Sequence, residues 1–348
     1  MQNAATIGLD LAKQVFQVHG TDAEGNTLFN RKLRRLEVKD FFQKLPPCTV
    51  VMEACGSAYH WAREIAALGH EAKIIPAQHV TPFVKRSKTD AGDAVAISEA
   101  AKRKGIRFVP IKTKGQQAAG MLLRTRTLLV RQRAGVINSV RSHLSELGLV
   151  AEKGTTNAGK LINAFRTGGV DVPDVARFAI NELVDEIDAL TVRIERLDRE
   201  LARQAKEDED LRRLMTVPGI GILTAATIKA HVADPGSFKS SRGFSAWLGL
   251  TPKQNSSGGK VRFGKISKMG DVEIRSLLYV GATSIIAGAR RTGFYPHWLL
   301  GLLQRRPHKV VVVALANKLA RIVWALLTKG GEYQQVGMKV AAPDGAKV

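Results

Sequence analysis

The sequence predicts an α/β domain, then a long helical region, then a mainly α-helical C-terminal domain. Short apolar runs alternate with helical patterns over roughly residues 1–110, as in domains where helices cover a sheet. Apolar residues spaced by three and four continue from about 174 to 206, which indicates a long helix. We place the domains at 1–112, 113–208 and 209–335, with a flexible tail over 336–348.

The first domain divides into elements at its turn and cap signals. Strands are expected from Thr6 to Leu9, in the β-rich run that follows it, after the Gly25–Asn26 turn, in "CTVVME" and in "EAKIIPA". Helices are expected over about 36–45, 59–68 and 90–104, the last ended by Gly105. The run "CTVVME" is apolar throughout, which is typical of a central strand.

The middle region is expected to contain two long helices, over about 116–148 and 174–206. The second has apolar positions that fit a coiled-coil seam of about three heptads: Ile180, Leu183, Ile187, Leu190, Ile194, Leu197 and Leu201. A long helix packed in a bundle fits the pattern equally well. The region is therefore a helical spacer or an oligomerisation arm, and Arg124 and Arg131 on its first helix are candidate nucleic-acid contacts.

The C-terminal domain opens with two helical patterns joined by Pro-Gly-Ile-Gly. This arrangement resembles a helix-hairpin-helix, in which glycines and the amides at a helix start hold a phosphate. Gly219 and Gly221 are the candidate contacts. The alternative is an ordinary glycine turn between two helices.

The charge balance narrows the class of partner. The formal net charge is +22, and residues 209–348 carry 21 basic but only 7 acidic side chains. Nucleic acid is the leading partner for such a chain, ahead of an anionic membrane surface. No secretory signal opens the sequence, and Lys318 and Arg321 interrupt the longest apolar stretch, so no membrane span is expected. Two cysteines, Cys48 and Cys55, suggest a reduced cytosolic setting without zinc.

Four acids stand out in the first domain. Asp10 and Glu53 each end an apolar strand, so adjacent strands would bring them together. Asp90 and Asp93 are three residues apart and share one helix face. Taken alone, this second pair suits a helix cap and an acidic first turn. Taken together, four carboxylates can hold two Mg²⁺ or Mn²⁺ ions for phosphodiester cleavage.

A second unusual stretch is "GLTPKQNSSGGKVRFGKISKMGD". Ser256 and Ser257 precede two glycines, and the following basic residues are Lys260, Arg262, Lys265 and Lys268. A flexible basic loop that grips phosphates is the simpler interpretation. The functional alternative is a serine nucleophile in a loop that a DNA backbone can approach.

These motifs resemble those of a known family. The segments "GLDLAK", "VVMEACGSAYHW", "KTDAGDA", "VPGIG" and "GLTPKQNSSGGK…GKISKMG" occur in the order seen in DEDD transposases of insertion elements, a family related to the Piv-type DNA invertases. The resemblance covers about residues 5 to 330. It implies an RNase H-like, RuvC-like first domain, a coiled-coil spacer and a C-terminal transposase domain.

The resemblance also implies roles for single residues. Asp10, Glu53, Asp90 and Asp93 become the metal-binding acids, and Ser257 becomes the nucleophile, with Ser256 one place away in the register. It further implies double-stranded donor and target DNA, a structured guide RNA from the element, and dimers or tetramers in which acids of one protomer meet the serine of another. Such a protein works in the bacterial cytosol or nucleoid.

The combined prediction is metal-dependent DNA cleavage and rejoining through a phosphoserine link. One rival is a RuvC-like endonuclease that cuts branched DNA without a covalent intermediate. The other rival is a basic nucleic-acid scaffold that has no enzymatic activity. Detection of a covalent protein–DNA complex would exclude the endonuclease, and detection of magnesium-dependent DNA cleavage would exclude the scaffold.

Overall fold

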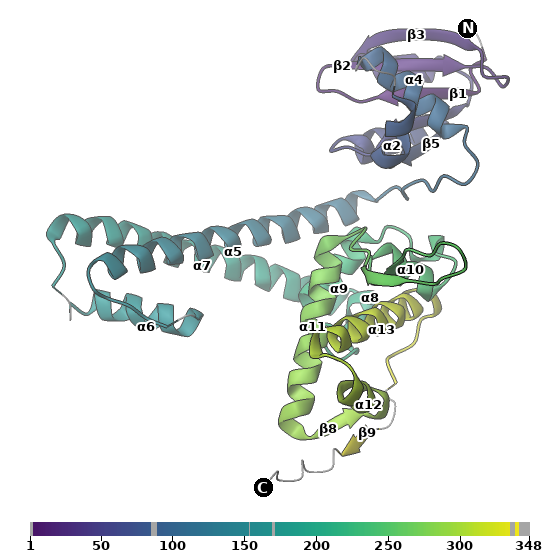
Figure 1. The fold of residues 1–348 in the computed structure, drawn as a ribbon. Coiled ribbons are helices and arrows are strands. Elements are labelled where there is room, and N and C mark those ends of the chain that lie inside the picture. The colour runs from purple at the N-terminus through teal and green to yellow at the C-terminus, as the bar shows by residue number, and fades with distance from the viewer. Residues whose placement is uncertain (1–2, 85–88, 153, 169–170, 335–337, 341–348) are drawn as a thin grey trace. The chain divides into compact units, whose positions relative to one another are not determined.

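The apolar runs at the start of the chain form one mixed sheet. The computed structural model describes residues 3–84, 89–152, 154–168, 171–334 and 338–340 (Figure 1). Its first five strands are β1 (Thr6–Asp10), β2 (Val15–Thr21), β3 (Thr27–Arg34), β4 (Thr49–Glu53) and β5 (Glu71–Ile75). They lie in the order β3-β2-β1-β4-β5, antiparallel from β3 to β1 and parallel from β1 to β5. The parallel strands β1 and β4 are therefore direct neighbours.

Helices cover both faces of this sheet, because side chains alternate between the faces along each strand. On one face, α1 (Glu37–Gln43) and α2 (Ala58–Ala67) pack on a core that includes Leu9, Phe16 and Met52. On the other face, α4 (Asp90–Ala101) packs on β1 and β2. The short segments α3 (Ala77–Val80) and η1 (Thr81–Phe83) precede α4.

Gly8 allows α4 to approach β1 closely. A Cβ at this position would lie 2.2 Å from the carbonyl oxygen of Ala94 and 2.8 Å from the amide nitrogen of Ser98. Any larger residue would therefore push the helix away from the strand. The glycine of "GLD" thus sets the distance between Asp10 and the helix that carries the other two aspartates.

The middle of the chain forms a helical hairpin. The long helices α5 (Lys114–Glu146) and α7 (Asp174–Glu207) run side by side, and α6 (Thr155–Arg166) packs at their far end (Figure 1). Five positions of the expected seam on α7 are buried, namely Ile180, Ile187, Leu190, Ile194 and Leu201, while Leu183 and Leu197 are partly exposed. The partner of this seam in the structure is α5 of the same chain.

The C-terminal region is mainly helical, as expected. Its elements are α8 (Glu209–Met215), α9 (Ile222–His231), η2 (Pro235–Ser237), α10 (Ser241–Trp247), β6 (Pro252–Gln254), β7 (Phe263–Ile266), α11 (Val272–Thr292), β8 (Phe294–Pro296), α12 (His297–Arg305), α13 (His308–Lys329) and β9 (Met338–Val340). Two helices, α11 and α13, have the length and composition of membrane spans. Each also contributes fully buried side chains, such as Leu278 and Val312, to the domain core.

The compact units of the structure are divided differently from the expected domains. The structure separates two compact units, residues 1–113 and 114–348, so the proposed division at 208/209 does not separate units. The reason is shared packing, because Leu123 of α5 and Leu201 of α7 belong to the same core as α9, α11 and α13. In the expected tail over 336–348, residues 338–340 form β9, which pairs with β8. Residues 336–337 and 341–348 lie outside the described residues.

Candidate active site

Two of the four acids end neighbouring strands. Asp10 is the last residue of β1 and Glu53 is the last residue of β4. The two strands are parallel, and Leu9 lies opposite Met52 in their register, so the following residues leave the sheet at the same edge. The sheet therefore places these two carboxyl groups side by side at one end, as the sequence predicted.

The other two acids occupy the first turn of α4. The cap of this helix is Thr89, whose Oγ1 accepts a hydrogen bond from the Gly92 amide at 3.1 Å. The interpretation of Asp90 as the N-cap is therefore wrong, because the neighbouring threonine performs that function. The carboxylates of Asp90 and Asp93 still face the favourable end of the helix dipole, but capping does not account for them.

The carboxyl group of Asp10 interacts electrostatically with all three of the other carboxylates. Burial and the negative charges of Asp93, Asp90 and Glu53 together raise the pKa of Asp10 to about 6, with burial the largest cause and the three charges following in that order. A carboxyl group in this setting loses its proton reluctantly because it adds one more negative charge to an acidic cluster. A cation placed among these groups would reverse the effect.

The four acids nevertheless do not form a finished ligand set. Across the part of the chain that the structure describes, no three His, Cys, Asp or Glu side chains converge closely enough to hold a metal ion. The donors themselves fit a hard divalent cation, since they supply only carboxylate oxygens and an excess of negative charge. The oxygen donors of Asp10, Glu53, Asp90 and Asp93, and the negative charge that they share, therefore fit a hard divalent cation.

The serine motif forms a β-hairpin rather than a simple loop. Strands β6 and β7 pair antiparallel, and Ser257 and Lys260 close the tip, where the Lys260 amide donates to the Ser257 carbonyl at 3.1 Å. Between them, Gly258 and Gly259 have φ values of 56° and 75°. Two successive positive φ angles are the pattern of a type I′ turn, which strongly favours glycine at its central positions.

The two serines are in different situations. The Ser256 hydroxyl accepts hydrogen bonds from the Gln254 side chain at 3.1 Å and from the Arg262 amide at 3.3 Å, so it links the two arms of the hairpin. The Ser257 hydroxyl has no hydrogen-bond partner among the described residues and is exposed. Only Ser257 therefore presents an uncommitted hydroxyl at the tip.

The base of the hairpin is tightly held. Gly249 and Gly270 have φ values of 70° and 73°, and a Cβ on Gly270 would lie 1.8 Å from the carbonyl oxygen of Trp247. Arg275 Nη1 donates to the carbonyl oxygens of Leu248 at 2.9 Å and Met269 at 2.8 Å. Arg275 was not predicted from the sequence, in which only the glycines that flank the motif indicate close packing there.

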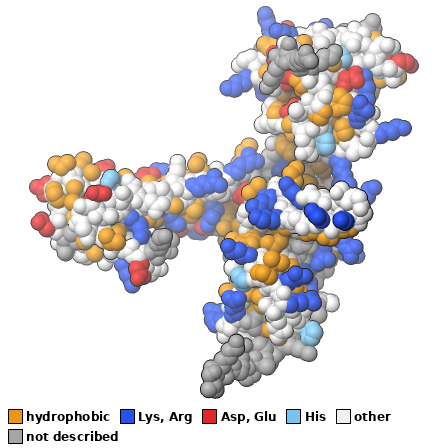
Figure 2. Space-filling model, in the orientation of Figure 1, with side chains coloured by type: hydrophobic (Ala, Val, Ile, Leu, Met, Phe, Trp, Pro, Cys, Tyr) orange, Lys and Arg blue, Asp and Glu red, His pale blue; other side chains and the backbone are white. Residues whose placement is uncertain are grey.

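The basic residues of the motif are available to a ligand. Lys260, Arg262, Lys265 and Lys268 are all exposed, and none forms an ion pair within the described residues. Figure 2 shows Lys and Arg side chains gathered on this part of the C-terminal unit. Arg124 and Arg131 are also exposed on α5, one heptad apart. Their roles in binding nucleic acid remain predictions.

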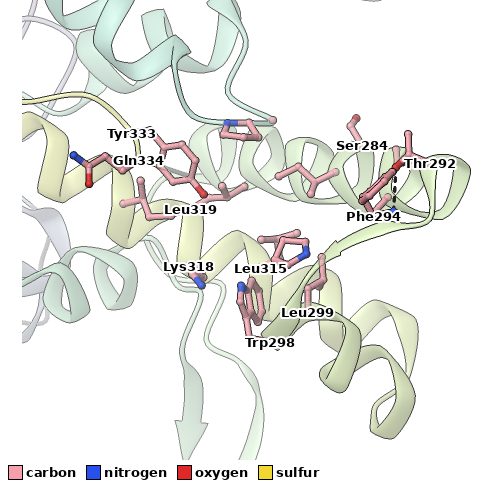
Figure 3. A pocket seen from close by; sticks show the side chains of 17 residues that line it. Ser284, Thr292, Phe294, Trp298, Leu299, Leu315, Lys318, Leu319, Tyr333 and Gln334 are labelled. Carbon is pink, nitrogen blue, oxygen red and sulfur yellow. Dashed lines mark hydrogen bonds between the residues drawn. The ribbon is translucent and has the colours of Figure 1, made fainter. Parts of the chain in front are cut away.

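The Pro-Gly-Ile-Gly turn lies between α8 and α9, and its first glycine has a packing role. A Cβ on Gly219 would lie 2.8 Å from the carbonyl oxygen of Gly281 on α11. Gly219 also lines an apolar pocket of about 810 Å³, where the Lys318 ammonium lies 4.1 Å from the Trp298 ring centroid (Figure 3). Packing therefore explains Gly219 without a phosphate. Gly221 is exposed at the N-cap of α9, where a phosphate contact remains a prediction.

Comparison with known proteins adds the family. A DEDD transposase model matches residues 7–148, and a model described as "Transposase IS116/IS110/IS902 family" matches residues 211–295. A probable family 20 transposase of Pseudomonas aeruginosa is 47% identical over 95% of this chain and 99% of its own length. The transposase for insertion element IS1328 of Yersinia enterocolitica is 38% identical over 96% of this chain and 100% of its own length.

A more distant relative is the pilin gene-inverting protein of Moraxella bovis, 26% identical over 35% of this chain and 38% of its own length. The DEDD match implies an RNase H-like first domain, with which the mixed sheet is compatible. It also suggests dependence on a divalent metal. The chain belongs to the IS110/IS116 family of DEDD transposases, enzymes that move insertion elements in DNA.

Proposed function

We propose that this transposase cuts and rejoins DNA through a covalent link to Ser257. The observation that carries the proposal is the uncommitted Ser257 hydroxyl at a glycine turn, on a hairpin whose exposed cations lack ion-pair partners among the described residues. A nucleophile must reach a phosphorus atom that is surrounded by sugar and oxygen. A projecting turn with two glycines allows that approach better than a buried side chain does.

The chemistry is a pair of balanced exchanges. The Ser257 oxygen attacks the scissile phosphorus and loses its proton, while the bond from phosphorus to the strand oxygen breaks and that oxygen gains a proton. A hydroxyl on the partner duplex then attacks the phosphoserine, and Ser257 leaves with a proton. Each step breaks one phosphoester bond and forms another, so no nucleotide cofactor is consumed.

The four acids of the first unit complete the proposal. Asp10, Glu53, Asp90 and Asp93 would hold Mg²⁺ or Mn²⁺, two ions in all, which would supply neutralisation of the phosphate and activation of the hydroxyl. Lys260, Arg262, Lys265 and Lys268 would bind the phosphates on either side of the cut. The acids and the serine lie in separate compact units, which is compatible with acids and serine supplied by different protomers.

We extend the proposal to the partners that the family resemblance implies. Donor and target DNA would be selected by pairing with a structured guide RNA, and the protein would act as a dimer or tetramer. The strong positive charge of residues 209–348 suits a complex that contains two duplexes and an RNA.

The test is a trapped covalent complex. A nicked DNA substrate with Mg²⁺ should give a denaturant-resistant adduct with the unmodified protein, and Ser257→Ala should abolish it while nucleic-acid binding persists. Ser256→Ala is the matched control and should retain the adduct at a reduced rate, because its hydroxyl only links the hairpin arms. An adduct that survives in Ser257→Ala would overturn the proposal. Cleavage by the unmodified protein without any adduct would favour the RuvC-like endonuclease.

A further inference from the structure

A groove lies beside the hairpin on the C-terminal unit. It has a volume of about 1050 Å³ and is formed by the β7 side of the hairpin together with α11 and α13. The cationic and aromatic side chains that line it are Lys265, Lys268, Arg275, Tyr279, Lys309 and Arg321. Six of the lining residues, Lys265 and Lys268 among them, belong to the motif that carries the serine, and the other ten lie on α11 and α13, so most of this surface is separate from the serine motif.

The groove is strongly and uniformly positive. Five of its lining side chains are cations, and no Asp or Glu lines it. None of the five forms an ion pair within the described residues, and the Nε atom of Arg321 is a buried donor without a hydrogen-bond partner. By contrast, cations of the helical arm are often paired, as Arg203 is with Glu200 and Glu207. Like charges in a concave surface concentrate the positive potential, which attracts an anion.

Part of the groove lining is apolar and accessible. Val280 is 60% exposed, Val310 is 52% exposed and Tyr279 is 37% exposed. An intact duplex presents phosphates on its outside and keeps its bases stacked within. An unpaired strand presents phosphates on one side and base faces on the other, and proteins that bind such strands combine a basic groove with aromatic stacking. The combination of cations and exposed apolar side chains in one lining matches the unpaired strand.

We propose that this groove binds an unpaired nucleic-acid strand, with phosphates on Lys265, Lys309 and Arg321 and a base stacked on Tyr279. The occupied groove leads the strand toward the hairpin tip. That last link rests on the proposed role of Ser257, whereas binding in the groove does not depend on it.

The experiment uses the full-length Ser257→Ala protein, so that binding is measured without chemistry. Fluorescence anisotropy would compare labelled oligothymidylate and oligouridylate of about 16 nucleotides, the upper end of a single-strand site, with a duplex of equal length. Tyr279→Ala should weaken single-strand binding roughly tenfold, within the range for loss of one base stack. Tyr279→Phe should bind as tightly as the parent because it keeps the ring. The two oligonucleotides show whether DNA or RNA is preferred.

A charge pair on one helix provides the matched control. Lys309→Glu and Lys329→Glu change the net charge equally on α13, but only Lys309 lines the groove. Lys309→Glu should weaken single-strand binding roughly tenfold at low salt, and Lys329→Glu should weaken it much less. Should these variants fold poorly, cross-linking of the unmodified protein to a bromouridine-containing strand should still label the peptide that contains Tyr279.

Several outcomes would overturn the inference. Equal losses for single strand and duplex would show a general phosphate surface. Unchanged binding combined with a changed oligomer mass in light scattering would show that a second copy of the chain occupies the groove. Labelling elsewhere, with none near Tyr279, would also reject it. A covalent adduct at Ser257 in the unmodified protein, together with any of these results, would reject the groove and leave the proposed function in place.

Discussion

Gly8 and Asp10 show how two residues on one strand can determine a site. Gly8 lets α4 rest on β1, and Asp10 at the end of that strand then experiences both aspartates of the helix. The sequence shows a glycine and an acid two positions apart, which is common and by itself uninformative. The close packing of the helix on the strand is what requires glycine at this position, because a methyl group there would meet backbone atoms of the helix that cannot move independently.

Replacement of Gly8 by Ala should therefore destabilise the first unit. The new Cβ would lie 2.2 Å from a backbone oxygen, so the helix must shift, and overpacking of this kind costs about 1–3 kcal/mol. Gly56→Ala is the matched control, since a Cβ there would meet nothing within 4 Å. Urea denaturation would measure both. Equal stabilities for the two variants would show that α4 is not held against the strand as described.

Asp10→Asn should stabilise the metal-free protein at neutral pH. The pKa of Asp10 is raised to about 6, above its ordinary value of 3.8, so its ionised form is disfavoured in the folded state. The cost is fully present above pH 6 and disappears as pH falls through 6 toward 4. Since the side chain is partly exposed, the gain in unfolding free energy should be only about 1–2 kcal/mol at pH 7.5.

Urea denaturation with a chelator, at pH 7.5 and pH 4.5, would measure this difference. Asp40→Asn, on the exposed side of α1, is the control and should show no gain. The unmodified protein, but not Asp10→Asn, should gain stability when Mg²⁺ is added, as ligand linkage requires. No difference between pH 7.5 and pH 4.5 would contradict the acidic cluster.

At the scale of elements, the serine hairpin combines a fixed base with an open tip. Glycines at 249 and 270 and the two hydrogen bonds from Arg275 fix the base, whereas Ser257 and the neighbouring basic residues are exposed. A nucleophile must be both reachable and well directed. The base supplies the direction, and the turn supplies the access.

Gly270→Ala should damage the hairpin more than Gly258→Ala does. Both positions have positive φ, so each substitution should cost about 1 kcal/mol in backbone strain. Only Gly270→Ala adds a steric clash, with its Cβ 1.8 Å from the Trp247 carbonyl oxygen, whereas a Cβ on Gly258 meets nothing within 4 Å. Thermal unfolding would rank the two variants, and the reverse order would refute this account of the base.

The sequence predicted local elements better than their partners. The expected helices over 116–148 and 174–206 correspond closely to α5 and α7, because a long apolar period is a strong local signal. Strands β6 and β7 were not predicted, since they are short and exposed, and their base is held by hydrogen bonds from the Arg275 side chain to carbonyl oxygens that no local sequence pattern reveals. The neighbourhood of β1 and β4, which places Asp10 beside Glu53, depends on sheet order and could only be hypothesised.

At the scale of the whole molecule, charge and structure are unevenly distributed. Residues 209–348 hold most of the excess positive charge, and the first unit holds the acidic cluster. This division suits an enzyme in which the C-terminal region binds DNA while the acidic cluster of the first unit binds metal cations. It also predicts that the grip on DNA depends steeply on salt.

A fourfold substitution would measure that grip. The variant changes four residues to Gln, namely Lys260, Arg262, Lys265 and Lys268. If each of them neutralises one phosphate, the magnitude of the slope of log affinity against log salt for duplex DNA should fall by about 3–4. The matched control changes four exposed cations of α7, Arg193, Arg196, Arg199 and Lys206, to Gln. The control removes the same total charge and should leave the slope nearly unchanged. Equal slopes for the two variants would place the grip outside the hairpin.

The helical hairpin of α5 and α7 also sets a fixed distance between its two ends. A helix of 33 residues, such as α5, extends roughly 50 Å at 1.5 Å per residue. Its near end is part of the C-terminal core through Leu123, and its far end is closed by a separate cluster around Leu144. Leu123 lies 23 residues before Glu146, the last residue of α5, so anything that binds the far end is held roughly 35 Å from that core, which is the length of about 10 base pairs of DNA.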